Sequence, residues 1–154
     1  MILTTHSVIG AASAYSLTQS PLIAFCVGFF SHFILDSIPH WEYYYSIKIN
    51  NLKINDKEFL KDFLKISADL LVAFLLVFLF IQRGFTFDPI IWLGALGAVL
   101  PDVLQFLGGE KRLVPFHFFR KLHDFTHSRI DFLSEKSFGF LFQLFLVLIF
   151  LSLV

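Results

Sequence analysis

Five apolar segments, separated by polar connections, constrain the fold of this chain more than any other feature. They cover residues 3–17, 20–38, 57–82, 89–107 and 138–154. A helix needs roughly 17–25 mostly apolar residues to cross the hydrocarbon core of a bilayer. With 56% hydrophobic residues and 22 phenylalanines, the 154-residue chain is too apolar for an ordinary soluble domain. The pattern predicts one all-α domain over residues 1–154, an integral membrane helical bundle with about five transmembrane helices.

Local signals indicate where several helices begin. Ser20 is a candidate N-cap with Pro21 at the first helical position, and Asp88 is a candidate cap before the fourth segment. The third segment starts amphipathic and is uniformly apolar from residue 70 to 81, so we expect it to begin at the interface and enter the membrane. Aromatic and basic residues alternate over 114–128, which predicts a short interfacial helix.

The order of the segments predicts on which side of the membrane each polar residue lies. Turns near residues 18–21 and 83–88 define one side, called the far side, and the N-terminus, residues 39–56 and residues 108–136 define the near side. Ionisable residues in membrane segments cost roughly 2.5–3.5 kcal/mol each and are candidates for function. The near side gathers a set of such residues: His6, His32, Asp36, Asp69, Asp102, His123 and His127. Their convergence predicts a metal site at a membrane interface.

Charge predicts the orientation and excludes one class of partner. Of the 12 lysines and arginines, only Arg83 lies on the far side, so the positive-inside rule places the near side in the cytoplasm. We therefore expect a multi-pass protein of the inner or plasma membrane, with the N-terminus and the site facing the cytoplasm. The formal net charge of +0 argues against nucleic-acid binding, which needs a dense basic surface.

His32 and Asp36 form the sharpest local motif. They are four residues apart, so a helix stacks them on one face within reach of one ion. Imidazole and carboxylate ligands suit zinc, manganese or iron. The structural alternative is a His–Asp hydrogen bond that holds the end of a helix.

His123 and His127 repeat this spacing and could clamp one metal ion, or could belong to a solvated interfacial helix. Asp102 follows Pro101 inside an apolar run. A proline at that position frees the carbonyl of Gly97 and bends the helix, and broken helices at membrane depth usually line a cavity or a site. The alternative for Asp102 is a polar helix end.

Three further residues have weaker signals. Asp69 could be a metal ligand or a general base, or could simply pair with Lys65 four residues earlier. His6 is a candidate only because it lies on the near side. His40 could be a ligand, a partner behind a ligand, or an interfacial anchor together with Trp41.

These motifs resemble a family. An early His6, the stretch His32-x3-Asp36-x2-Pro39-His40, the run Leu100-Pro101-Asp102 and the pair His127-Ser128 resemble the small membrane-bound metal-dependent hydrolases of the LexA-regulated inner-membrane hydrolase-like group. That group is similar, more distantly, to zinc-dependent phospholipase C. The resemblance implies a hydrolase with a zinc-type centre that acts on phosphoesters. After Asp102 the family often continues x-Asp-His, whereas this chain has Val103, Leu104 and Gln105.

The sequence therefore predicts a membrane-embedded metal-dependent hydrolase with one or two divalent ions, zinc before manganese or iron. Metal-activated water at the cytoplasmic interface would attack a phosphoester or phospholipid-type substrate, and Asp69 could act as general base. The expected partners are membrane lipids and a lipid or lipid-linked substrate. The alternative is a non-catalytic membrane metal-binding protein or a structural helical bundle.

Overall fold

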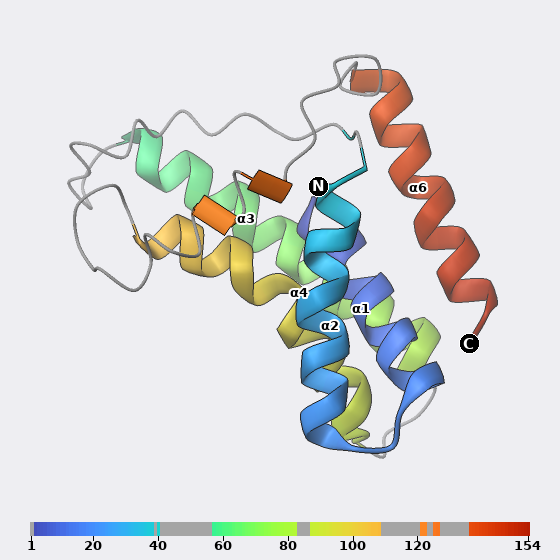
Figure 1. The fold of residues 1–154 in the computed structure, drawn as a ribbon. Helices are drawn as coiled ribbons and strands as arrows, with labels where there is room; N and C mark the ends of the chain where they lie inside the picture. Colours follow the sequence, from blue (N-terminus) through green and yellow to red (C-terminus); the bar gives the residue numbers. More distant parts are fainter. Residues whose placement is uncertain are drawn as a thin grey trace.

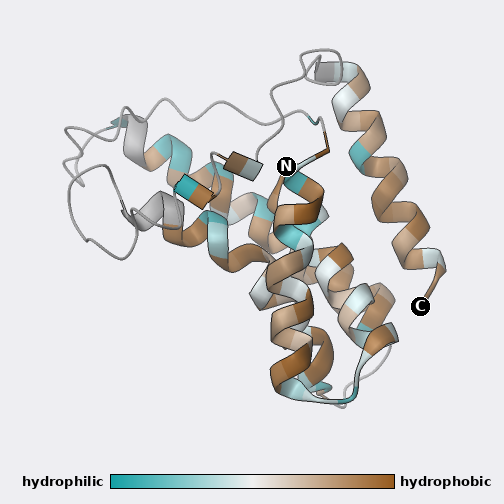
Figure 2. Cartoon of the chain, in the orientation of Figure 1, coloured by the Kyte–Doolittle hydropathy of each residue, from teal (hydrophilic) through white to brown (hydrophobic). Residues whose placement is uncertain are grey.

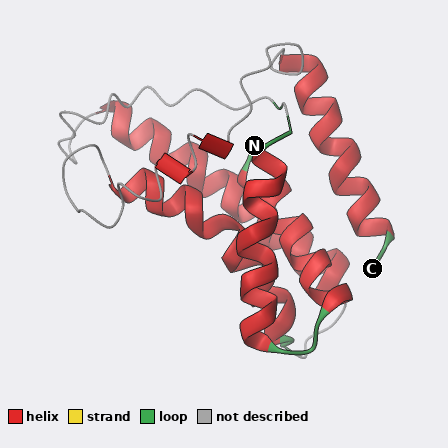
Figure 3. Cartoon of the chain, in the orientation of Figure 1, coloured by secondary structure: helices red, strands yellow, loops and turns green. Residues whose placement is uncertain are grey.

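The computed structural model describes residues 2–38, 40, 57–82, 87–108, 121–122, 125–126 and 136–154, and these contain helices and turns but no strand (Figure 3). The elements are α1 (Leu3–Leu17), α2 (Pro21–Asp36), α3 (Lys57–Leu76) with its π-helical continuation η2 (Val77–Gln82), α4 (Pro89–Gly108) and α6 (Lys136–Ser152). The predicted all-α class is confirmed. Of the predicted interfacial helix 114–128, only 121–122 and 125–126 lie among the described residues, and both pairs are helical.

The local start signals act as predicted at α4 and only in part at α2. Asp88 caps α4, because its Oδ1 accepts a hydrogen bond of 2.9 Å from the backbone N–H of Ile90. Helix α2 begins with Pro21 after Ser20, although the Ser20 side chain makes no capping hydrogen bond. Pro101 lies inside α4, which continues past it to Gly108.

Helix α1 is the centre of the arrangement. Residues 3–12 are all buried, and α1 contacts α2, α3, α4 and α6. The turn at 18–20 makes α1 and α2 an antiparallel hairpin, so the N-terminus lies beside the C-terminal end of α2 (Figure 1). Residues that begin α1 and end α2 are therefore brought together at one end of the hairpin.

Small residues set how closely α1, α2 and α4 approach. A Cβ on Gly28 would collide with the carbonyl oxygen of Gly94, and a Cβ on Gly97 would collide with that of Phe25. A Cβ on Gly10 would collide with Ala98. These contacts bring backbone against backbone, as small residues do at close helix crossings. They lie about one helical turn from His6, His32 and Asp102 and so fix the spacing of the helices that carry those side chains.

The outer helices expose apolar side chains, and Figure 2 shows that most residues along α6 are hydrophobic. Among the described residues, one helix has the length and composition of a membrane span, the 23-residue stretch Leu60–Gln82, and only 17% of its most apolar window is buried. The apolar stretches Pro21–Asp36, Pro89–Leu104 and Ser137–Ser152 are shorter. The sequence predicts five spans, and the described helices include one that meets the length criterion.

Candidate metal centre

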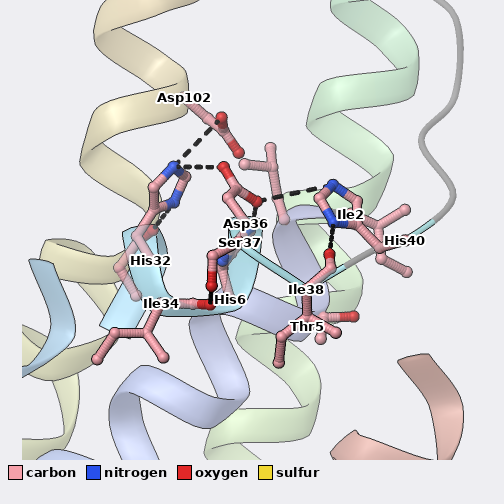
Figure 4. A network of polar contacts seen from close by, with 12 residues as sticks. Ile2, Thr5, His6, His32, Ile34, Asp36, Ser37, Ile38, His40 and Asp102 are labelled. Atoms are coloured by element: carbon pink, nitrogen blue, oxygen red, sulfur yellow. Dashed lines mark hydrogen bonds and ion pairs between the residues drawn. The ribbon is translucent and has the colours of Figure 1, made fainter. Parts of the chain in front are cut away.

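Three helices bring imidazole and carboxylate groups to one buried point (Figure 4). His6 comes from the start of α1, His32 and Asp36 come from the end of α2, Asp102 comes from α4, and His40 follows α2. The side chains of His6, His32 and Asp36 are 0% exposed. Helix α1 begins where α2 ends, so the hairpin places residues 26 positions apart in direct contact.

The spacing of the ligand atoms is compatible with a metal ion. His6 Nε2 lies 3.1 Å from Asp36 Oδ1, and His32 Nε2 lies 3.1 Å from Asp36 Oδ2. One ligand atom from each of the three residues lies within 4.8 Å of the other two. Zinc bonds nitrogen and oxygen at about 2.0–2.2 Å, which separates tetrahedral ligands by roughly 3.3 Å. This buried group could therefore hold a divalent metal ion.

Two more groups stand at the edge of this cluster. Asp102 Oδ1 lies 3.7 Å from His32 Nε2, and the Asp102 side chain is 20% exposed. His40 Nε2 lies 3.7 Å from Asp36 Oδ1, and His40 is buried. The predicted residue Asp102 is thus brought to the cluster, and so is His40, for which the sequence left several roles open.

Backbone carbonyl groups orient two of the histidines. His32 Nδ1 lies 2.9 Å from the carbonyl oxygen of Ala98, and His40 Nδ1 lies 2.6 Å from that of Ile38. A carbonyl oxygen only accepts, so each Nδ1 carries a proton and donates it. In the neutral ring this leaves the lone pair on Nε2, the nitrogen that points at Asp36. A metal-binding histidine characteristically donates its other N–H to a carbonyl or carboxylate in this way.

His6 is the residue of the cluster whose polar atoms are least satisfied by hydrogen bonds. Both of its ring nitrogens are buried, and neither makes a hydrogen bond of good geometry to the described part of the chain. Leaving a buried polar group unsatisfied costs about 1–3 kcal/mol. The His6 ring stacks on His32, with 4.2 Å between ring centroids and 29° between ring planes. A ligand bound beside Asp36 would satisfy the Nε2 of His6.

Asp69 anchors the start of α1. Its Oδ2 accepts a hydrogen bond of 2.7 Å from the N–H of Leu3, and its Oδ1 accepts one of 3.1 Å from the N–H of Thr4. The Thr4 hydroxyl also donates to Asp69, at its carboxylate and at its carbonyl oxygen. From α6, Gln143 Oε1 accepts a hydrogen bond of 3.0 Å from the N–H of Ile2. The carboxylate of Asp69 therefore satisfies N–H groups that every helix leaves open at its N-terminus.

The predicted site residues consequently divide into three sets. His6, His32, Asp36 and Asp102 come together, whereas Asp69 holds the helix that carries His6 and is not among the three residues of the metal group. Lys65, the alternative partner for Asp69, lies 3.0 Å from Asp62 Oδ1. His123 and His127 lie outside the described residues.

The sequence prediction left the role of His40 open and did not include the carbonyl group of Ala98, yet both belong to the site. His40 lies four residues after Asp36, the same spacing that singled out His32, and this periodicity was available as a signal. The Ala98 carbonyl had no signal, because every residue carries a backbone carbonyl and only the fold selects one.

Comparisons with known proteins found no match: no protein-family model, curated protein or solved structure matches the chain.

Proposed function

We propose that this protein is a membrane-embedded, metal-dependent hydrolase that acts on phosphoester substrates. The observation that carries the proposal is the buried group of His6, His32 and Asp36, whose ligand atoms lie within 4.8 Å of one another. A divalent ion bound there, zinc before manganese or iron, would lower the pKa of a bound water and polarise a phosphoryl oxygen. The resemblance to membrane-bound metal-dependent hydrolases agrees with that chemistry.

The polarity of the cluster supports a bound cation over a network that merely holds helices together. Asp36 is fully buried, and three imidazoles, those of His6, His32 and His40, direct Nε2 atoms at its carboxylate. For His32 and His40, the neutral ring would present a lone pair to a carboxylate oxygen, which is a repulsive arrangement. A cation between them reverses the sign of that interaction and compensates for burial of the charge.

Access for a substrate is supported by Asp102. It is the partly exposed member of the cluster, whereas His6, His32 and Asp36 are fully buried. A substrate would therefore approach from the side of α4 on which Asp102 lies. In this proposal Asp102 and Asp36 supply the negative charge that holds the ion, and the carbonyl of Ala98 orients His32.

The exposed apolar helices support a location in the membrane. The stretch Leu60–Gln82 is long enough to cross a bilayer and is mostly exposed, unlike the core helix of a soluble protein. Helices α1 and α4 contact this stretch, and α2 and α6 contact α1. We propose that all four cross the membrane as well, with the cluster at the cytoplasmic side because the basic residues flank it. A site at that depth favours a lipid or lipid-linked substrate.

Metal content measured by mass spectrometry on detergent-purified protein tests the proposal. At least one equivalent of zinc, manganese or iron should be present in the wild type. Asp36→Asn should lose it, and His32→Ala should bind less metal than the wild type. Asp88→Asn is a matched control, because Asp88 caps the opposite end of α4. The wild type should then hydrolyse a phosphodiester or a phospholipid in mixed micelles in a metal-dependent way.

A folded wild type that binds no metal and cleaves neither substrate would refute the hydrolase and favour a structural bundle. Metal bound with correct stoichiometry, but no hydrolysis across phosphomonoesters, phosphodiesters and phospholipids, would favour a non-catalytic metal-binding protein.

A further inference from the structure

The two oxygens of the Asp36 carboxylate have separate sets of partners. Oδ1 lies 3.1 Å from His6 Nε2 and 3.7 Å from His40 Nε2. Oδ2 lies 3.1 Å from His32 Nε2, and that nitrogen lies 3.7 Å from Asp102 Oδ1. Each oxygen therefore has its own nearest imidazoles, those of His6 and His40 at Oδ1 and that of His32 at Oδ2, and the Asp102 carboxylate lies beside the His32 nitrogen (Figure 4).

The stacking of His6 on His32 bears on how many ions the cluster holds. The lone pair of an imidazole nitrogen lies in the plane of its ring, and good metal bonds follow that direction. The two ring planes are inclined by 29° with centroids 4.2 Å apart, so they converge only well beyond the ~2.1 Å length of a zinc–nitrogen bond. A single ion bonded to both nitrogens would lie out of the plane of at least one ring.

Two ions remove this conflict. Stacked rings whose Nε2 atoms point the same way hold two ions at about the separation of the rings, which is 4.2 Å between centroids. Metal ions in two-metal hydrolytic sites lie roughly 3.5–4 Å apart and share ligands. A carboxylate with one oxygen toward each ion is a suitable bridge at that separation.

We infer that the site binds two divalent ions bridged by Asp36, an inference that rests on the metal site of the proposed function. One ion takes His32, Asp102 and Asp36 Oδ2, and the other takes His6, His40 and Asp36 Oδ1. His40 is therefore a metal ligand. A pair of cations at this distance clamps two oxygens of one phosphoryl group, which favours a phosphoester over a carboxylic ester as the substrate.

Metal stoichiometry tests the inference, because the two ions have different outer ligands. The wild type should bind two equivalents of manganese. His40→Ala and Asp102→Asn should each bind one, and Asp36→Ala should bind neither tightly. Asp88→Asn should keep two, and circular dichroism should show that every variant counted is folded.

Electron paramagnetic resonance of the manganese-loaded wild type tests directly whether two Mn²⁺ ions share a ligand. Two Mn²⁺ ions sharing a carboxylate should give an exchange-coupled signal, whereas His40→Ala and Asp102→Asn should give the signal of isolated Mn²⁺. One equivalent without coupling in the folded wild type would overturn the two-ion inference and leave a single-ion hydrolase standing. If His40→Ala and Asp102→Asn each still bind two equivalents of manganese, the inference is also overturned, because the second ion would then lie elsewhere. Absence of any bound metal would overturn the proposed function with it.

Discussion

Replacing Asp69 separates the role that the structure gives this residue from the role of general base. Asp69→Ala removes a charged acceptor from the N–H groups of Leu3 and Thr4 at the start of α1. Hydrogen bonds to charged groups contribute about 1.5–3 kcal/mol each, and the two share one carboxylate, so we expect a loss of about 2–4 kcal/mol in unfolding free energy. Asp69→Asn keeps one acceptor oxygen and should lose about half as much.

The assay is thermal unfolding in detergent, followed by circular dichroism, beside metal content and turnover of a phosphodiester. An anchoring role predicts that Asp69→Asn melts earlier than the wild type, yet keeps its metal and stays within a few-fold of wild-type kcat at temperatures well below its Tm. A fall in kcat of about 100-fold or more, in a folded and metal-loaded Asp69→Asn protein, would match loss of a general base and refute the anchoring argument.

Three other perturbations follow from the packing and the site. Gly28→Ala places a Cβ against the backbone of α4 at Gly94 and should lower the unfolding free energy by about 1–3 kcal/mol. Equal unfolding temperatures for the wild type and Gly28→Ala would contradict the close crossing. Gln143→Leu removes the acceptor for the N–H of Ile2 and should lower the unfolding free energy by about 1–2 kcal/mol while leaving metal stoichiometry unchanged, as metal analysis would check. Chelation of the wild type should lower its Tm, since an ion present at 100 times its Kd stabilises by about 2.7 kcal/mol, and Asp36→Ala should show no such shift.

The helices could be predicted from the sequence because each corresponds to a long apolar run with a polar segment on either side. The predicted 3–17 and 57–82 segments coincide with α1 and with α3 plus η2, and Asp88 caps α4 as expected. The number of membrane spans could not be settled the same way. Length and apolarity together select only Leu60–Gln82 among the described helices, because α2 and α6 are shorter.

The site was partly predictable, and the reason lies in how each residue reaches it. His32 and Asp36 are on one helix face, so their spacing alone predicts their contact. The positions of His6 and Asp102 near His32 depend on the alternating directions of α1, α2 and α4, and these directions follow from the order of the segments. Asp69 lies outside the group of His6, His32 and Asp36. Its position near the cluster did not reveal that the open N–H groups of α1 compete for its carboxylate.

The composition of helix α1 is explained by its position at the centre of the bundle. This helix is the least apolar of the five segments, and Thr4, Thr5, His6 and Ser7 follow one another along it, a composition that a lipid-facing helix would not favour. All four side chains are buried, because α2, α3, α4 and α6 surround this helix. Polar residues cost little there when partners are supplied. Asp69 and Gln143 supply hydrogen-bond partners to Thr4 and Thr5 from two different helices, and His6 lies against Asp36 of α2. The weak apolarity of α1 is therefore a consequence of its central position, and the same position lets His6 meet the end of α2.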